Sequence, residues 1–237
     1  MKRYGIRAVA VAAAILAAPL AVSAQELRFS VQQQAEEEGE YELLPMKTGF
    51  LIGGRISGMA GEVDPWIPVD YEDLFGTGVG VFVEGRVMWE IDMGTWMGGY
   101  LSLGWDGYEG RRYTDAYGDS LEPDEMEITT ALVGLKWIYL FTPRVYVEGH
   151  GGIGVAHYGD VDGTFTSGGI PEPVRIFEAS TAGVFDMGVR LGYTRKRFVA
   201  EIGFGIRFQG APDNADFDFD STGPAVFALE AAIGLQF

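Results

Sequence analysis

Histidine is the side chain that most often serves as a general base near neutral pH, and this sequence contains two, His150 and His157. Both lie in the stretch "HGGIGVAH", which supplies no neighbouring Ser or Asp to act as a nucleophile or to orient an imidazole. A histidine near a carboxylate such as Glu148 is more often a satisfied core residue than a catalyst. We therefore expect no enzymatic activity, because no catalytic site assembles around either imidazole.

Carboxylates are the second group that could do chemistry. The stretch "APDNADFDFDST" brings together Asp213, Asp216, Asp218 and Asp220. Clustered carboxylates suit Ca²⁺ or Mg²⁺, which prefer oxygen ligands. The spacing lacks the turn glycine and the distal glutamate of an EF-hand, so a solvated negative surface is the competing interpretation. We expect no cofactor beyond a loosely bound Ca²⁺ or Mg²⁺ at these four residues.

Most other charged residues recur at every second position, and this spacing defines the elements that carry them. In "VGVFVEGRVMWEI" (79–91), the apolar positions alternate with a face that holds Glu84, Arg86 and Glu90. A period of two predicts a β-strand. The same alternation along the chain predicts a set of inward-facing residues: Arg55, Glu84, Arg86, Glu90, Lys136, Glu148, His150, Asp186, Arg190, Glu201, Arg207 and Glu230. Near balance of acids and bases favours ion pairs that fill a closed interior, since buried charges persist only when paired.

Eight such segments are predicted, each long enough to cross a bilayer as a tilted strand: 48–57, 78–91, 95–108, 127–139, 145–158, 181–194, 198–209 and 225–237. Three connections are short, at 92–94, 141–144 and 195–197. The other four, 58–77, 109–126, 159–180 and 210–224, are long and polar. Alternating short and long connections are typical of outer-membrane barrels, although a lipocalin-like barrel approaches the pattern. We predict an all-β fold, an eight-stranded antiparallel up-and-down transmembrane β-barrel.

The first residues predict export. Residues 1–24 combine a basic start, a short apolar run and small residues before Gln25, as in a cleaved signal peptide. Three parts follow: a signal peptide at 1–24, a periplasmic N-terminal segment at 25–47 and a barrel at 48–237. The chain has no cysteine to form a disulfide or to carry a lipid. Its formal net charge of −17 argues against nucleic-acid binding.

The final stretch "VFALEAAIGLQF" alternates large apolar residues and stops at Phe237. With the signal peptide, the eight strands and the loop asymmetry, it resembles the small outer-membrane β-barrel families grouped around OmpX, OmpW, the opacity proteins and the barrel domain of OmpA. The resemblance covers residues 48–237. It implies recognition of the last strand by the barrel assembly machinery through five outward residues: Phe227, Leu229, Ile233, Leu235 and Phe237.

Aromatic residues at strand ends predict two girdles at the membrane boundaries. The periplasmic girdle comprises Trp89, Trp137, Tyr139, Tyr193, Phe198 and Phe237, and the outer girdle comprises Trp105, Tyr158, Phe208 and Phe227. We expect a monomer in the outer membrane with both termini in the periplasm. Its expected partners are outer-membrane lipids and lipopolysaccharide, with which the acidic loops would share divalent cations.

The resemblance leaves the role of the barrel open. A non-enzymatic role in membrane integrity or in surface interaction through the long acidic loops is the first hypothesis. A narrow channel for small or hydrophobic molecules, as proposed for OmpW-like barrels, is the alternative. Barrels that deacylate or acylate lipid A look similar, but the deacylase pattern of His followed two residues later by Ser is broken here by Gly152.

Overall fold

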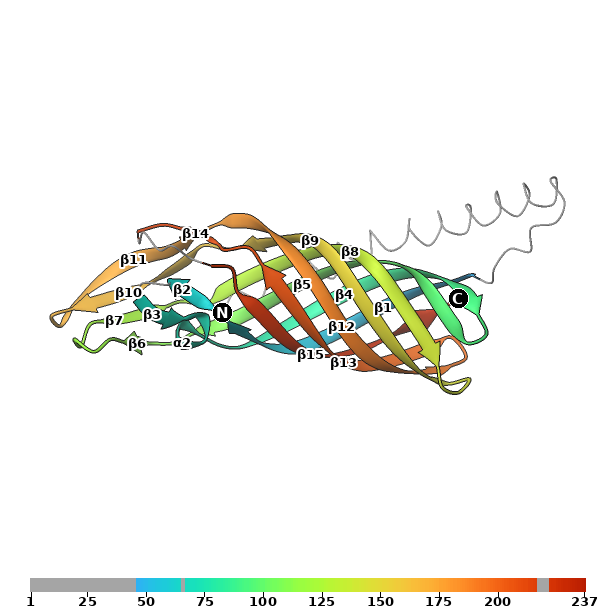
Figure 1. Cartoon of the computed structure of the whole chain (residues 1–237). Helices are drawn as coiled ribbons and strands as arrows, with labels where there is room; N and C mark the ends of the chain where they lie inside the picture. The colour runs from blue at the N-terminus through green and yellow to red at the C-terminus, as the bar shows by residue number, and fades with distance from the viewer. Residues whose placement is uncertain (1–45, 65–66, 217–221) are drawn as a thin grey trace.

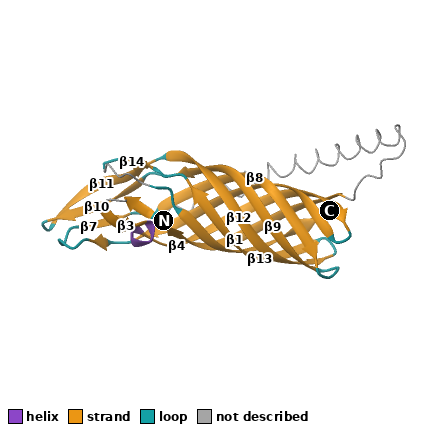
Figure 2. Ribbon diagram, viewed as in Figure 1, coloured by secondary structure: helices purple, strands orange, loops and turns teal. Residues whose placement is uncertain are grey.

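The computed structural model describes residues 46–64, 67–216 and 222–237. The predicted signal peptide, and all but two residues of the predicted periplasmic segment, lie outside the described residues, as do Asp218 and Asp220. Most of the described chain is β-strand (Figure 2). In the part of the chain that is described, no helix is long and apolar enough to cross a membrane.

Eight long antiparallel strands close into a barrel in the order β1-β15-β13-β12-β9-β8-β5-β4 (Figure 1). They are β1 (Met46–Ala60), β4 (Phe75–Asp92), β5 (Thr95–Gly110), β8 (Met126–Leu140), β9 (Val145–Tyr158), β12 (Ser180–Arg195), β13 (Phe198–Gln209) and β15 (Ala225–Gln236). The predicted fold class is confirmed. Each observed strand agrees with a predicted one, although β4 begins three residues earlier.

The barrel is closed by pairing between its first and last strands. β1 and β15 pair antiparallel from Gly49 with Gln236 to Ala60 with Ala225. On its other side β1 pairs with β4, so neither edge of β1 is left open. Closure satisfies the backbone hydrogen-bonding groups of every barrel strand, which an open sheet cannot do.

Side chains alternate between the interior and the outer surface along every barrel strand. In β15, Val226, Ala228 and Glu230 are buried, whereas Phe227 and Leu229 are exposed. The exposed apolar residues of the other strands follow the same rule. The outer surface of the barrel is therefore apolar, and its interior contains the charged residues.

The two ends of the barrel differ. At one end, which we call the turn end, β4 and β5, β8 and β9, and β12 and β13 are joined by short turns. At the other end the chain forms further strands: β2 (Glu62–Asp64), β3 (Ile67–Asp70), β6 (Tyr113–Thr114), β7 (Ser120–Pro123), β10 (Val161–Ser167), β11 (Ile170–Glu178) and β14 (Asp213–Asn214). β2 and β3 pair with each other, and the remaining five form a sheet in the order β14-β11-β10-β7-β6.

We call this five-stranded sheet the extension. It projects beyond the barrel, away from the C-terminal end of the chain (Figure 1). The sequence indicated four long polar loops, and three of them contribute strands to this sheet, the segment 159–180 most extensively. Between β10 and β11, Gly168 and Gly169 have φ angles of 57° and 82°, which two-residue hairpin turns require and glycine adopts without strain.

A four-residue helix, α2 (Tyr71–Leu74), lies between β3 and β4 at the mouth of the barrel (Figure 2). The backbone N–H of Asp70 donates a hydrogen bond to Asp73 Oδ2 at 3.1 Å, which ties the first turn of the helix. Tyr71 and Leu74 are fully buried. The helix thus carries two large side chains into the mouth of the barrel.

Candidate functional site: the barrel interior

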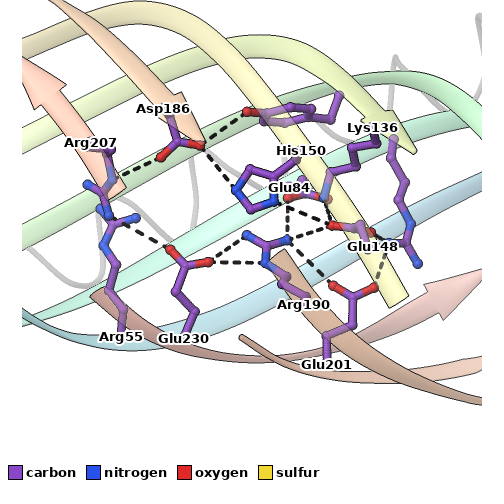
Figure 3. Close-up of polar contacts among 12 residues, drawn as sticks. Arg55, Glu84, Lys136, Glu148, His150, Asp186, Arg190, Glu201, Arg207 and Glu230 are labelled. Atoms are coloured by element: carbon purple, nitrogen blue, oxygen red, sulfur yellow. Dashed lines mark hydrogen bonds and ion pairs between the residues drawn. The ribbon is translucent and has the colours of Figure 1, made fainter. Parts of the chain in front are cut away.

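The charged side chains of the barrel interior form one connected network (Figure 3). Its members are Arg55, Glu84, Arg86, Asp106, Lys136, Glu148, His150, Asp186, Arg190, Glu201, Arg207 and Glu230. All but His150 are less than 9% exposed as whole residues, and the His150 side chain is 3% exposed. Eleven were predicted to face inward. Asp106 was missed, although it shares its face of β5 with the buried Tyr100.

The part of the network nearer the turn end pairs two basic residues with three carboxylates. Arg86 Nη1 lies 2.8 Å from Glu148 Oε2 and 2.6 Å from Glu201 Oε1. Lys136 Nζ lies 2.7 Å from Glu84 Oε1 and also contacts Glu148. Each base therefore bridges two carboxylates that come from different strands, which is how buried charges are stabilised away from water.

The part nearer the extension is built on Arg55 and Arg207. Arg55 forms a two-point ion pair with Asp106, and Arg207 Nη1 lies 3.0 Å from Asp106 Oδ2. Arg207 Nε also approaches Asp186 Oδ1 at 3.3 Å, and its Nη2 lies 3.9 Å from Glu230 Oε1. These contacts connect β1, β5, β12, β13 and β15 across the lumen.

Arg190 joins the two parts. Its Nη1 lies 2.9 Å from Glu84 Oε2 and 3.5 Å from both Glu148 and Glu201, while its Nη2 lies 2.8 Å from Glu230 Oε2. Arg190 thus contacts four carboxylates from four strands. A guanidinium suits this position, because its five N–H donors can serve several acceptors at once.

His150 lies between two carboxylates of the network. Its Nε2 is 3.3 Å from Asp186 Oδ2, and its Nδ1 is 3.9 Å from Glu148 Oε1. Asp186 also accepts a hydrogen bond from the Tyr100 hydroxyl at 3.3 Å. Every described ion-pair contact of the imidazole is to a carboxylate of the network. The position of His150 therefore suits a structural role.

Apolar side chains close the lumen on both sides of the network. Toward the turn end, buried residues lie two positions beyond members of the network: Met88, Ile138, Tyr146 and Val199, joined by Trp96. Toward the extension a larger cluster includes Tyr71, Leu74, Tyr108, Met126, Ile128, Tyr158, Ile176, Phe177, Val184 and Val226. The Tyr71 ring stacks on that of Phe177 at 6.3 Å. The lumen is thus a charged layer between two apolar layers.

Buried hydroxyl groups attach these apolar layers to the polar groups around them. Tyr146 donates a hydrogen bond to Glu201 Oε1 at 2.5 Å, and Tyr158 donates to Gln209 Oε1 at 2.8 Å. The Tyr71 hydroxyl has no hydrogen-bond partner among the described residues. Burial raises the pKa of Tyr71, so its hydroxyl stays protonated.

Two predicted positions differ from those observed. Tyr158 was placed in the outer girdle, but it is fully buried, because alternation from the inward His150 directs it into the lumen. Glu90 was placed among the interior charges. It is half-buried beside the β4–β5 turn, where it accepts a hydrogen bond from the Gly94 N–H at 3.3 Å.

Most of the other predicted girdle residues are exposed on the outer surface. At the turn end these are Trp89, Trp137, Tyr139, Tyr193, Phe198 and Phe237, and at the opposite end Phe208 and Phe227. Trp105 is half-buried. The five residues of the predicted assembly signal, Phe227, Leu229, Ile233, Leu235 and Phe237, are also exposed. Their exposure leaves them accessible to a partner, and their recognition remains a prediction.

The candidate metal residues do not converge in the part of the chain that is described. There, no group of three or more His, Asp or Glu side chains is arranged to hold a metal ion. Asp213 and Asp216 are exposed, and Asp216 Oδ2 accepts a hydrogen bond from the Arg175 backbone N–H at 2.6 Å. The Arg175 side chain pairs with Asp162 at 2.9 Å on the outer face of the extension.

His157, the second imidazole, lies on the outer surface of the barrel. Its Nδ1 is 3.1 Å from Thr181 Oγ1 on the neighbouring strand, a contact that sequence spacing did not reveal. A hydroxyl and an imidazole are two of the three members of a Ser-His-Asp type of catalytic triad, and the third is a carboxylate that orients the imidazole. Among the described residues, no hydrogen bond or ion pair links His157 to a carboxylate that would orient its ring.

Solved structures of outer-membrane proteins match this chain along most of its length. Ail, the attachment invasion locus protein of Yersinia pestis, in complex with the heparin analogue sucrose octasulfate, is 14% identical over 82% of this chain and 100% of its own, with a TM-score of 0.43. The protease OmpT of Escherichia coli is 7% identical over 84% and 98%, with a TM-score of 0.46. Neisserial surface protein A is 10% identical over 81% and 97%, with a TM-score of 0.35.

No family model matches the sequence, and no curated protein does. The fold is therefore assigned from the closed barrel in the structure of the chain itself. At these identities and TM-scores, the likenesses assign no activity, ligand or partner to it.

Proposed function

We propose that the protein is a closed, non-enzymatic barrel of the outer membrane that displays the acidic extension outside the cell. The apolar outer surface of the eight strands supports a position in a bilayer, because a soluble barrel would leave this surface in water. The turn end then faces the periplasm. Folded barrels of this type migrate differently on detergent gels before and after boiling. A soluble periplasmic protein without such a shift would contradict the proposed location.

The single observation that carries the closed state is the charged network between two apolar layers. An ion crossing the lumen would have to pass buried ion pairs and then side chains that offer it no ligands. We expect refolded protein in a planar bilayer to show no steady unitary conductance. Openings that disappear when a bulky residue replaces Ala232 in the lumen would instead support the alternative, a narrow channel.

The extension supports a role in surface interaction or in membrane integrity. Segments 61–74, 109–125, 159–179 and 210–224 hold three basic residues, Arg111, Arg112 and Arg175, and acidic residues outnumber them in each segment. Such a surface would repel the phosphates of lipopolysaccharide unless divalent cations lay between them. Calorimetric titration of the folded protein with Ca²⁺ should give heat and a higher unfolding temperature. Absence of both effects would show that the protein does not bind Ca²⁺ and would contradict this part of the proposal.

The non-enzymatic part of the proposal is supported by the surroundings of the two histidines, of which His150 contacts carboxylates of the ion-pair network and His157 has no described carboxylate partner. Mass spectrometry of lipid A from cells with and without the protein should show the same acyl pattern. A changed pattern that His157→Ala restores to normal would identify an enzyme.

A further inference from the structure

The outer wall of the barrel contains a hollow of about 350 Å³ over β1, β4, β5 and β8. It begins at the turn end beside Trp89 and Phe237, and it extends along the wall as far as Val83 and Leu103. Its volume is at the lower end of the range for small-molecule sites, about 300 to 1,000 Å³. Because most of its lining is apolar, water would find few hydrogen-bond partners there. The hollow therefore suits an elongated apolar group.

Two glycines that face outward form the floor of the hollow, Gly85 and Gly99. In the described chain, a Cβ atom added at Gly85 would meet no heavy atom within 4 Å, and one added at Gly99 would meet only Gly134 O, at 3.6 Å. The outward residues beside them, such as Leu101 and Val133, are large. The hollow thus results from missing side chains, and a larger residue at Gly85 would fill it without a clash.

A basic turn lies beside the Phe237 edge of the hollow at the turn end. The Arg197 guanidinium lies 5.6 Å from the centre of the Phe237 ring, which lines the hollow. Arg195 and Lys196 precede Arg197 in the same turn, and all three residues are exposed. Arginine binds phosphate through two parallel N–H···O hydrogen bonds. An anionic group at this end of the hollow would therefore be attracted.

We propose that the hollow binds one anionic phospholipid, with an acyl chain over Gly85 and Gly99 and the phosphate at Arg197. The inference rests on the proposed membrane location, and it adds to that location a lipid class and a binding site. The acidic extension lies at the opposite end of the barrel and would repel the same headgroup. Charge and shape thus agree on one orientation of the lipid, with its headgroup at the turn end.

A second copy of the chain is the main competing occupant. Two copies inserted in the same orientation have their turn ends at the same level, so contact through the hollow would bring their basic turns together. Like charges at close range oppose such contact, whereas a phosphate at Arg197 is attracted. The basic turn beside the hollow therefore favours the lipid.

Native mass spectrometry of the mature barrel tests the acyl-chain part. The probe is an equal mixture of phosphatidylglycerol and phosphatidylcholine with identical acyl chains, supplied in mixed micelles. Wild type should retain one phosphatidylglycerol, and Gly85→Leu should lower the retained fraction at least fivefold. Gly183→Leu is the matched control, because a Cβ at this outward glycine of β12 also meets no described heavy atom within 4 Å and Gly183 lies outside the hollow.

The headgroup part is tested by Arg197→Gln. This variant should lose most of the preference for phosphatidylglycerol over phosphatidylcholine. Arg144→Gln removes the same charge from the β8–β9 turn, where Arg144 accepts a hydrogen bond from Thr194 of β12, whereas Arg197 accepts one from Gln236 beside Phe237; this variant should keep the preference. Equal loss in both variants would indicate general attraction to a basic rim and would overturn the assigned phosphate site.

Three outcomes would overturn the proposal as a whole. They are equal retention of the two lipids by wild type, unchanged retention by Gly85→Leu, and a dimer that Gly85→Leu dissociates, which would assign the hollow to a second copy. The boiling-dependent gel shift and insertion into vesicles are recorded for every variant. If wild type fails to insert, the proposed location fails; if it inserts and retains no lipid, only the lipid site fails.

Discussion

The barrel interior and the extension are both rich in carboxylates, but they stabilise these charges in opposite ways. In the interior, Arg190 is almost fully buried and contacts four carboxylates. In the extension, the side chains of Arg175 and Asp162 are 47% and 57% exposed, although they form an ion pair at 2.9 Å. Buried charges must be paired to offset the loss of hydration, whereas the exposed charges of the extension are solvated by water. Similar residue types therefore make a rigid core in one region and a solvated surface in the other.

Removing one base from each region should show the largest difference. Arg190→Leu leaves four buried carboxylates short of a cation, and it should lower the free energy of unfolding by about 3 to 5 kcal/mol or prevent folding. Arg175→Leu, the matched variant in the extension, should leave unfolding unchanged. Urea titration of the refolded proteins in lipid vesicles, followed by tryptophan fluorescence, measures both. Equal losses would mean that the two regions do not differ as described.

A charge added at an exposed apolar position tests whether that position faces lipid or water. Leu229 on the barrel wall and Ile170 on the extension are 65% and 66% exposed, so they are matched in accessibility. Leu229→Arg should cost about 2 to 4 kcal/mol, because it places a cation against hydrocarbon. Ile170→Arg should be nearly neutral. The same urea titration applies, and similar tolerance of both would argue against a bilayer around the barrel.

The hydroxyl at the edge of the network should have a smaller effect. Tyr146→Phe removes the hydrogen bond to Glu201, which keeps its contact with Arg86 at 2.6 Å. The expected loss is about 1.5 to 3 kcal/mol, typical of a hydrogen bond to a charged group. Tyr117→Phe is the control, since Tyr117 in the turn between β6 and β7 is 94% exposed and should not respond. No loss in Tyr146→Phe would show that the contact contributes little.

The smallest effect is expected at Tyr71. Tyr71→Phe removes a buried hydroxyl that has no partner among the described residues, so the free energy of unfolding should stay the same or rise by up to about 1 kcal/mol. Thermal unfolding in detergent measures the change. A decrease of more than about 1 kcal/mol would reveal that a bound water or another group satisfies the hydroxyl.

Alternation made most of the barrel predictable. Where one face of a strand is buried and the other meets an apolar surrounding, each residue has one permitted side, so Glu84 and Arg86 could be assigned inward from spacing alone. The same rule predicts the positions of Asp106 and Tyr158. Tyr158 was misplaced because its aromatic ring was given more weight than its parity, and Asp106 was left out of the inward set. Asp106 completes six acids that face five Arg or Lys residues and His150.

The extension was less predictable because its strands are short and lie largely in water. Glu172, Pro173 and Val174 show no lasting alternation, so the segment looked like a loop. One signal was available: Gly168–Gly169 between two short runs rich in β-branched and aromatic residues predicts a hairpin. The contact between His157 and Thr181 depends on the register of β9 with β12, which the sequence of either strand alone does not determine.

The seam between β1 and β15 bears on how fast such a barrel can be made. It pairs Gly49 with Gln236, near the two ends of the described chain. Contacts so distant in sequence form slowly, because the entropy of closing a long loop is lost before any pairing energy is gained. Until the seam forms, β1 and β15 each present an unpaired edge to which another chain can bind. The yield of folded protein should therefore depend on the time for which these two edges stay open.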